Sequence, residues 1–159
     1  MKKIISILTV FLISFISIAQ EAPTQVLPKI TDVPNHQGWI NDANVASQLS
    51  QKTGAPILLF FTGSDWCGWC VRLHNEVLSK AEFKTWAKQK GIILLEVDFP
   101  RRKQQSDALK QQNASLQQQF QVRGFPTVYV IKGKKIAKVG YEAGGPKAWI
   151  AKVEAQIEL

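Results

Sequence analysis

The two cysteines of the chain, Cys67 and Cys70, are separated by two residues and follow an apolar segment. A Cys-x-x-Cys pair is typical of a metal-binding knuckle or of a disulfide that opens and closes during a reaction. It does not act as a structural framework, because the loop that it closes is too short to join distant segments. The pair is therefore expected either to exchange electrons or to hold a ligand.

The available residues disfavour both haem and metal chemistry. Covalent haem attachment needs histidine directly after the second cysteine, where this chain has Val71. A zinc site needs two further ligands, and only His36 and His74 could supply them. An inert buried pair is disfavoured as well, because the bend at residues 63–65 exposes the segment. We therefore expect a redox-active pair with no metal and no cofactor, and ordinary structural roles for the two histidines.

The residues around the pair predict a strand, a bend and a helix. Residues 57–62 form a continuous apolar run, typical of a strand buried on both faces. A bend follows at Gly63, and a helix begins near Cys67. Unpaired N–H groups at a helix N-terminus stabilise an anion, which makes a thiol there more nucleophilic at neutral pH. Cys67 is therefore the expected nucleophile; Cys70, one turn further in and more buried, resolves the mixed disulfide, and Gly68 leaves the approach open.

The rest of the chain alternates between helical and strand patterns. The glutamine-rich residues 104–119 could be disordered, but apolar residues at helical spacing favour two helical turns divided at Asn113. The other expected elements are a helix from Asn41 that stops at Gly54, a helix opened by a capping box at residues 79–82, strands at residues 92–98, 127–131 and 135–139, and a final helix from Pro146. A βαβ half followed by a ββα half predicts an α/β fold of three layers, with helices on both faces of one mixed sheet.

The N-terminus has the pattern of a secretory signal peptide. A positive start precedes an apolar run, and small residues around Ala19 suit a signal peptidase, so residues 1–19 are expected to be removed. An uncleaved membrane anchor is the alternative. Residues 20–38 then form an extended leader and residues 39–159 one domain. We expect the protein in the periplasm or otherwise exported. Disulfides persist there, so a pair that must be reduced needs an electron donor, for which a membrane protein is the hypothesis.

The charge of the chain is positive but scattered. The formal net charge is +8 at pH 7, and loss of Lys2 and Lys3 with the signal peptide would leave +6. Basic residues occur singly or in short groups such as residues 101–103, which favours a solvated basic surface over nucleic-acid binding. We expect a monomer whose partners are proteins with thiols or disulfides.

Segments far apart in the sequence resemble landmarks of the thioredoxin superfamily. Residues 60–70 are similar to the family's strand, bend and Trp-Cys-Gly-x-Cys site. Residues 122–127 are similar to its second landmark, a cis-proline that opens the third central strand, and residues 131–140 to the hairpin after it. The resemblance implies the thioredoxin fold, with a central mixed sheet of four or five strands, and thiol–disulfide exchange. It also implies that Pro126 faces the cysteines and that the Phe125 main chain bonds an extended substrate.

Two positions depart from the family's pattern. Trp69 stands where thioredoxins usually have proline before the second cysteine. The strand before the site carries Phe60 and Phe61 where thioredoxins have a buried acid that assists deprotonation of the resolving thiol. Asp65 and Glu96 are the candidates to replace that acid, although Asp65 is expected to be a solvated loop residue.

The sequence therefore predicts an exported thiol–disulfide oxidoreductase that acts on protein substrates, with reductase or isomerase activity preferred over oxidase activity. The alternative is a non-catalytic binding module of the same fold. In either case Trp66 and Trp69, placed on a bend, are expected to form an apolar contact surface together with Phe125.

Overall fold

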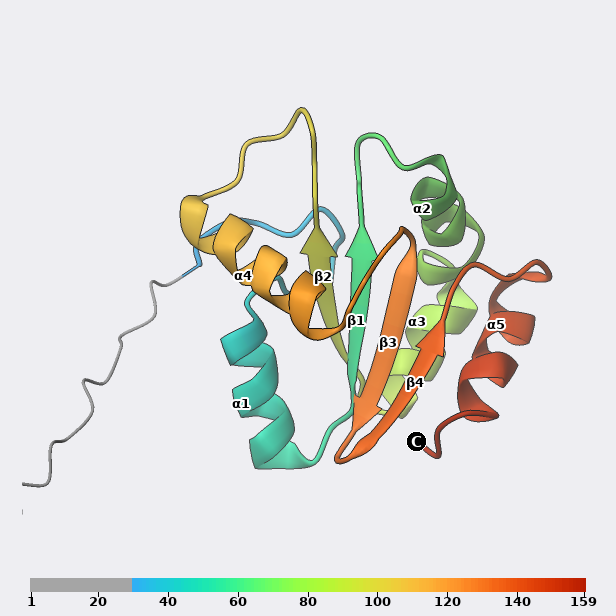
Figure 1. Ribbon diagram of the computed structural model, residues 1–159. Helices are drawn as coiled ribbons and strands as arrows, with labels where there is room; N and C mark the ends of the chain where they lie inside the picture. The colour runs from blue at the N-terminus through green and yellow to red at the C-terminus, as the bar shows by residue number, and fades with distance from the viewer. Residues whose placement is uncertain (1–29) are drawn as a thin grey trace, which may run out of the picture.

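The computed structural model describes residues 30–159, so the expected signal peptide and the first part of the expected leader lie outside the described residues. Within residues 30–159, one sheet of four strands is flanked by helices on both faces (Figure 1). This arrangement confirms the three-layer α/β architecture of the thioredoxin fold.

The sheet is mixed and has the strand order β2-β1-β3-β4. β1 pairs parallel with β2 and antiparallel with β3, and β3 pairs antiparallel with β4. At the outer edge of β2, Ile40 adds one parallel bridge to Leu95, which holds the segment before residue 43 beside the sheet. The strands are β1 (Ile57–Thr62), β2 (Ile93–Asp98), β3 (Thr127–Lys132) and β4 (Lys135–Val139).

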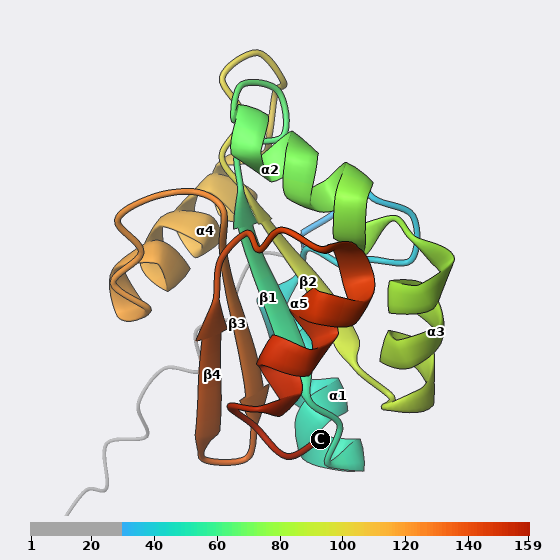
Figure 2. The same ribbon diagram turned by 90° about the vertical axis from the view of Figure 1, so that its right-hand side faces the viewer.

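The helices divide between the two faces of the sheet. Figure 1 shows α1 and α4 on one face, and Figure 2 shows α5 in front of the other face with α2 above it. α2 continues directly into a π-helical turn, η1, so the two form one helical rod. The helices are α1 (Ala43–Thr53), α2 (Gly68–Leu73), η1 (His74–Leu78), α3 (Ala81–Gln89), α4 (Asp107–Gln119) and α5 (Gly145–Glu154).

The apolar run of β1 supplies both cores, because successive side chains of a strand point to opposite faces. Leu58 and Phe60 pack in the core beneath α2, α3 and α5. Leu59 and Phe61 pack in the second core, beneath α1 and α4. A strand that is apolar at its first five positions therefore fits the central layer, as the sequence predicts.

The glutamine-rich segment forms one continuous helix, α4, so the predicted division at Asn113 is wrong. Asn113 is buried, and its side-chain N–H donates to the carbonyl oxygen of Asp98 at 2.8 Å. Its polarity therefore serves a contact with the end of β2 rather than a turn. The helix is capped by Ser106, whose Oγ accepts from the N–H of Leu109.

The predicted capping box at residues 79–82 is also wrong. The residue that precedes α3 is Lys80, and its side chain makes no capping hydrogen bond. Ser79 instead ends η1, and its hydroxyl donates to the carbonyl oxygen of Asn75 at 3.3 Å. The serine is recruited by the helix before it, because that helix extends through residue 78.

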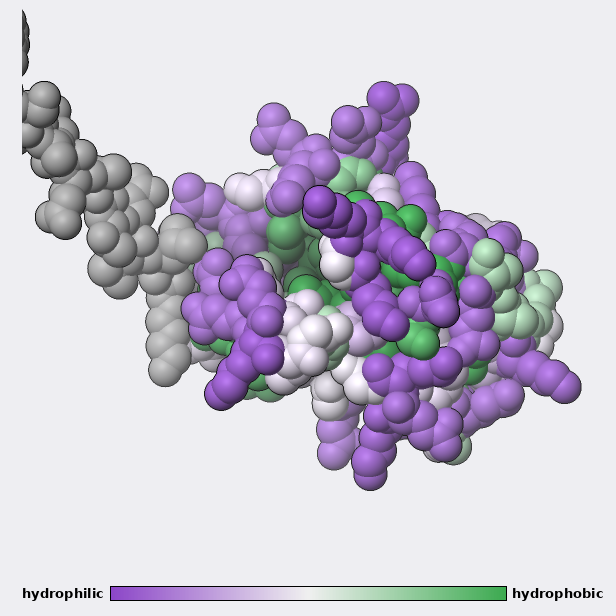
Figure 3. Space-filling view, turned by 90° about the horizontal axis from the view of Figure 1, so that it is seen from below, coloured by the Kyte–Doolittle hydropathy of each residue, from purple (hydrophilic) through white to green (hydrophobic). Residues whose placement is uncertain are grey.

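The end of the molecule seen from below is covered mainly by hydrophilic residues, with hydrophobic ones visible between them (Figure 3). This end lies away from α2, which Figure 1 places at the top. In the part of the chain that the structure describes, no helix combines the length and the apolar character that crossing a bilayer requires.

Replacing Trp149 by alanine is expected to destabilise the fold by about 3–5 kcal/mol, because it empties a large buried site. Trp149 is 0% exposed, and its indole N–H donates to the carbonyl oxygen of Gly140 at 2.9 Å. The matched control is Trp69→Ala, the same change at a side chain that is 56% exposed, with an expected loss below about 1 kcal/mol. Urea unfolding of both variants with the disulfide intact measures the difference; equal losses would contradict this account of the core.

Candidate active site

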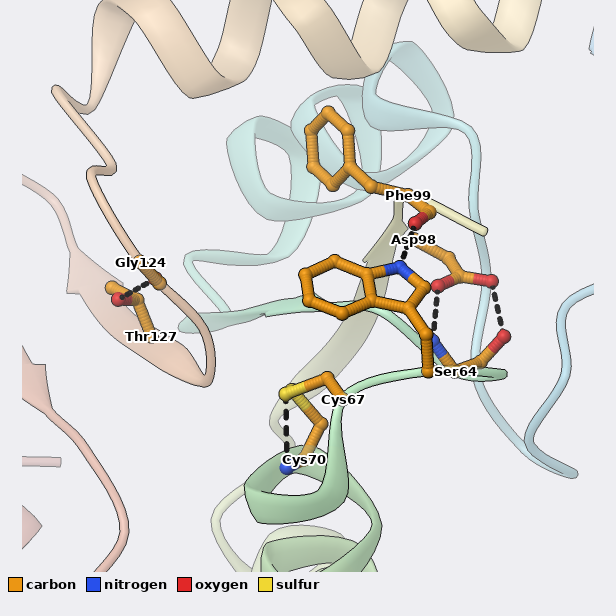
Figure 4. The surroundings of a disulfide bond; sticks show 8 residues. Ser64, Cys67, Cys70, Asp98, Phe99, Gly124 and Thr127 are labelled. Carbon is orange, nitrogen blue, oxygen red and sulfur yellow. Dashed lines mark hydrogen bonds between the residues drawn. A yellow bond between two sulfur atoms is a disulfide. The ribbon is translucent and has the colours of Figure 1, made fainter. Parts of the chain in front are cut away.

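Cys67 and Cys70 lie where β1 passes into α2, at the carboxyl end of the strand, and they form a disulfide. Cys67 is the N-cap residue of α2, and the N–H of Cys70 donates to Cys67 Sγ at 3.2 Å (Figure 4). Cys67 is 7% exposed and Cys70 is 1% exposed. The two sulfurs are thus unequal: one lies at the helix N-terminus, where negative charge is stabilised, and the other lies deeper.

The bend before Cys67 is fixed to the end of β2. The Asp98 carboxylate accepts from the Ser64 N–H at 2.8 Å and from the Ser64 hydroxyl at 2.7 Å (Figure 4). The indole N–H of Trp66 donates to the carbonyl oxygen of Phe99 at 2.7 Å. These bonds fix the path of the chain from β1 into α2, and so they fix the position of Cys67.

Asp65 is a loop acid, as expected, and it also anchors the loop after β2. Its carboxylate accepts from the main-chain N–H groups of Arg101, Arg102 and Lys103 at 3.0, 2.7 and 3.2 Å. These hydrogen bonds, that from Arg101 foremost, hold the pKa of Asp65 below its ordinary value. The loop after β2 is therefore tied to the cysteine segment through an ionised side chain.

Gly63 is required by the close approach of Trp66. A Cβ atom on Gly63 would lie 2.4 Å from Cε2 of the indole. Any larger residue at this position must displace Trp66 from Phe99. The glycine of the bend therefore acts through packing against the indole.

The aromatic residues around the cysteines form two clusters, whereas the sequence predicts a single surface. Trp66 meets Phe125 edge-on, with ring centroids 5.8 Å apart. Trp69 instead packs against Tyr141, with centroids 5.3 Å apart. The ring contacts among residues 30–159 do not join the two tryptophans. Both remain exposed, so each can meet a partner molecule on its own side of the cysteines.

An arginine accompanies each tryptophan. The guanidinium of Arg101 lies 4.1 Å from the centre of the Trp66 ring system, and that of Arg72 lies 5.4 Å from Trp69. Cations in this position are attracted to an aromatic face. The aromatic rim of the site is therefore also positively charged.

Tyr141 and Glu76 complete the cluster around Trp69, and sequence reasoning missed both. The Tyr141 hydroxyl donates to the Glu76 carboxylate at 2.5 Å, and Arg72 Nε donates to the same carboxylate at 2.8 Å. The bond to Glu76 raises the pKa of Tyr141, and the bond from Tyr141 lowers the pKa of Glu76. The spacing of four residues between Arg72 and Glu76 on a helix is enough to predict their ion pair from the sequence. The position of Tyr141 cannot be predicted in this way, because Tyr141 follows β4 and no local pattern places it beside Trp69.

The second landmark contacts the cysteine segment through Phe125, whose ring meets Trp66. The Phe125–Pro126 peptide bond is cis, as the resemblance implies. Gly124 and Thr127, which flank that peptide, lie on the side of the disulfide opposite Ser64 (Figure 4). Phe125 also contacts the Phe99 ring, at a centroid distance of 5.2 Å, and thereby joins this segment to the loop after β2.

Gly68 lies between the cysteines and is exposed. A Cβ atom built on it would meet nothing within 4 Å. The space beside Cys67 at the start of α2 is therefore open on this side.

Glu96 is a buried carboxylate on β2, 1% exposed, and it pairs in register with Phe60 of β1. The main-chain N–H of Asn35 donates to its Oε2 at 2.9 Å, and His36 Nδ1 lies 3.1 Å from the same atom. Burial raises the pKa of Glu96, but the hydrogen bonds from His36 and Asn35 outweigh that effect, so the pKa lies below its ordinary value. Glu96 is therefore an ionised acid one strand away from the position where thioredoxins carry theirs.

Comparison with known proteins identifies the family. The model of the thioredoxin-like domain matches residues 43–154. The chain belongs to the thioredoxin-like family. Disulfide bond reductase DsbH of Chlamydia pneumoniae is 41% identical over 118 residues, which cover 72% of this chain and 69% of the relative. The thioredoxin-related protein DsbJ of the same organism is 30% identical over 111 residues, which cover 67% of this chain but only 32% of DsbJ.

Solved structures agree with this family. A structure of a DsbH oxidoreductase is 34% identical, has a TM-score of 0.70, and matches 83% of this chain and 95% of that one. The C-terminal domain of Neisseria meningitidis DsbD in its oxidised form has a TM-score of 0.52 at 16% identity over 75% of this chain and 99% of that one, and it supports the fold alone. The Cys67–Cys70 disulfide and the similarity to the two DsbH proteins show that the protein is a thiol–disulfide oxidoreductase.

Asp65→Asn is expected to reduce stability in a pH-dependent way. The folded-state pKa of Asp65 lies below the ordinary value of 3.8, so its stabilising effect is present above that pH. It is lost as the pH falls through the folded-state pKa. The difference in unfolding free energy between wild type and variant should therefore be constant above about pH 5 and shrink below pH 3.8.

Chemical denaturation at a series of pH values measures this difference. The control is Glu158→Gln, at a carboxylate whose side chain is 87% exposed. A difference for Asp65→Asn that grows on acidification would show that the three N–H donors do not stabilise the ionised form.

Proposed function

We propose that this protein is an exported reductant of protein disulfides, with Cys67 as the nucleophile and Cys70 as the resolving cysteine. The observation that carries the assignment of roles is the inequality of the two sulfurs: Cys67 Sγ accepts a hydrogen bond from the start of α2, whereas Cys70 is almost fully buried. Similarity to a disulfide bond reductase supports the direction of electron flow.

The reaction transfers two electrons from the protein to the substrate. The Cys67 thiolate attacks one sulfur of a substrate disulfide, forms a mixed disulfide and releases the other sulfur as a thiolate. The Cys70 thiolate then attacks Cys67 Sγ, which closes the Cys67–Cys70 disulfide and releases the second substrate sulfur. The substrate leaves as a dithiol after it takes up two protons. A further turnover requires a donor that reduces the protein again, and we assign this role to a membrane partner.

The substrate is proposed to bind as an extended chain along the Phe125–Pro126 segment. Among the hydrogen bonds of residues 30–159 that lie outside the helices and strands, none engages the Phe125 main chain. Its polar groups are thus available to a substrate backbone in the manner of an added strand. Trp66 and Trp69 would then contact the residues around the substrate cysteine. The open space at Gly68 would leave room for the substrate chain.

Export is proposed from the signal-peptide pattern of residues 1–19. A lone exchanging disulfide suits a compartment in which substrates acquire disulfides. The positively charged aromatic rim suits client proteins with acidic or aromatic residues near their cysteines, because cation–π and ionic contacts are then both available.

Single cysteine variants test the roles of the two sulfurs. Cys67→Ser is expected to abolish the protein's acceleration of insulin reduction by dithiothreitol, since the remaining thiol, Cys70, is only 1% exposed. Cys70→Ser is expected to accumulate a mixed disulfide between Cys67 and the substrate, since the resolving thiol is absent. Turbidity of the precipitating insulin chains measures the first, and non-reducing electrophoresis with mass analysis measures the second. Activity that survives Cys67→Ser would refute the assignment, and an inactive wild type would favour the binding module.

The reduction potential tests the direction. Thioredoxin, a reductant, has a potential of about −270 mV and DsbA, an oxidant, about −120 mV. We expect the Cys67–Cys70 pair to lie below about −200 mV, on the reducing side of this range. Equilibration in glutathione buffers, followed by alkylation of the free thiols, gives the value. A potential near that of DsbA would contradict the reductase assignment and leave the thiol–disulfide exchange itself intact.

A further inference from the structure

A cavity of about 210 Å³ lies beside the buried Cys70. Its lining includes His36, Ser64 and His74, together with Cys70 itself. His74 comes from the helical turn that follows Cys70, whereas His36 comes from the segment before α1. Of the residues that line this cavity in the described structure, only the cysteine and the two histidines carry ionisable side chains.

The two imidazoles form a stacked pair. Their ring centroids are 4.0 Å apart and their planes are inclined by 30°. His36 Nδ1 lies 3.1 Å from Glu96 Oε2, and because the carboxylate is ionised this contact makes Nδ1 the donor. His74 Nδ1 is buried without a hydrogen-bond partner, the one side-chain nitrogen or oxygen in this state among residues 30–159. The pair thus joins a buried carboxylate on one side to a free ring nitrogen on the other.

Burial and the neighbouring charged groups set the protonation state of the histidine pair. Burial lowers the pKa of His74 to about 4, with a smaller effect from His36, so His74 is neutral at pH 7. Glu96 and Asp98 of β2 are the carboxylates of this region, and Asp98 is occupied by Ser64 and Asn35. The cations that face it are Lys84 of α3 and Lys103, whose ammonium donates to Asn35 Oδ1 at 2.6 Å.

The resolving step creates a need for a base at this position. Cys70 is a thiol while Cys67 is held in the mixed disulfide, and it attacks only as a thiolate. At 1% exposure, its sulfur has little access to solvent. The carboxyl that assists this step in thioredoxins is absent, because β1 carries Phe60 and Phe61.

We propose that the stacked His36–His74 pair accepts the proton of the Cys70 thiol when the mixed disulfide is resolved. The S–H bond of Cys70 breaks, its proton bonds to an imidazole nitrogen, and the thiolate attacks Cys67 Sγ. The Cys67 bond to the substrate sulfur breaks, and the released substrate thiolate takes up a proton from the imidazolium or from solvent. Two electrons pass from the protein to the substrate. The inference rests on thiol–disulfide exchange by the two cysteines; in the reverse direction the imidazolium returns the proton to Cys70 as it leaves Cys67.

Glu96 is the positioning residue of this arrangement. It orients His36 through Nδ1 and supplies a negative charge beside the imidazolium that forms. The transfer converts a thiol, a neutral imidazole and a carboxylate into a thiolate, an imidazolium and a carboxylate, so the net charge of the buried cluster does not change. A transfer of this kind avoids the cost of adding a net charge to a buried site.

Stopped-flow oxidation of the reduced protein by dithiodipyridine separates the two steps. Attack by Cys67 releases the first thiopyridone, and attack by Cys70 releases the second, so two phases of equal amplitude are expected. The variants are His36→Phe and His74→Phe, which keep an aromatic ring in the stack, together with Glu96→Gln. The control is Asn75→Ala, at an exposed position of η1 next to His74. The first phase reports that the fold and Cys67 are intact in every variant.

We expect each histidine variant to slow the second phase about 100-fold at pH 7, a usual loss for a missing general base. The midpoint of the pH dependence of the second phase should move toward the pKa of an unassisted thiol, about 8.5. The first phase should stay within about twofold of wild type, since the helix N-terminus that activates Cys67 is unchanged. Glu96→Gln should slow the second phase less than either histidine variant, and Asn75→Ala should leave both phases unchanged.

Rescue with a small base keeps the test decisive if a phenylalanine variant fails to fold. Dissolved imidazole should accelerate the second phase of His74→Ala, which enlarges the cavity, and should not accelerate that of wild type. Histidine variants with a wild-type second phase at every pH would overturn the proposal. The same holds if Glu96→Gln alone slows that phase, because the carboxylate itself would then be the acceptor. Loss of the first phase in wild type would instead contradict the role of Cys67.

Discussion

The parallel register between β1 and β2 is the constraint on which the site depends. It places Glu96 beside Phe60 and Asp98 beside Thr62, at the end of the sheet where β1 passes into the cysteine segment. A shift of one residue would turn both carboxylates to the opposite face, because side chains alternate along a strand. The burial of Leu95 and Val97 of β2 in the second core opposes such a shift, because the shift would expel both side chains from that core. The apolar core therefore sets the electrostatics of the active site.

Two buried carboxylates at one end of a sheet require compensation, since a buried charge is costly unless it is hydrogen-bonded or paired. Asn35 supplies much of it: its N–H donates to Glu96, and its side-chain amide donates to Asp98 at 2.7 Å. Residues 30–42 thus act as part of the site, although the family match begins at residue 43. The bridge between Ile40 and Leu95 holds this segment in place. His36 lies outside residues 43–154, which the family model matches.

The parts of the structure that could be predicted from sequence are those with a local signal. The apolar run forms the predicted strand β1, and the Phe125–Pro126 peptide bond is cis as the resemblance implies. Each of these signals lies within a few consecutive residues. Asn113 could not be read correctly, because its partner is the carbonyl oxygen of Asp98. Within the sequence alone an isolated asparagine in a polar helix is a breaker signal; in the folded protein it is a buried donor.

The sequence predicts neither the contact of Tyr141 with Trp69 nor the pairing of the two histidines, and the reason is the same. Tyr141 reaches Trp69 from beyond β4, and His36 reaches His74 across almost forty residues of sequence. No periodicity links such residues, because their contact depends on how the layers pack. The sequence therefore predicts ordinary roles for the two histidines, and only the three-dimensional arrangement brings their rings together.

The position of the acid explains why histidines are needed at all. A carboxyl on β1 would lie on the strand that leads directly to the cysteines. Here β1 carries Phe60 and Phe61, and the acid stands on β2 beside Phe60, one strand spacing or about 4.8 Å away. His36 and His74 occupy the region between Glu96 and Cys70, with Glu96 bonded to the first ring and Cys70 sharing a cavity with both.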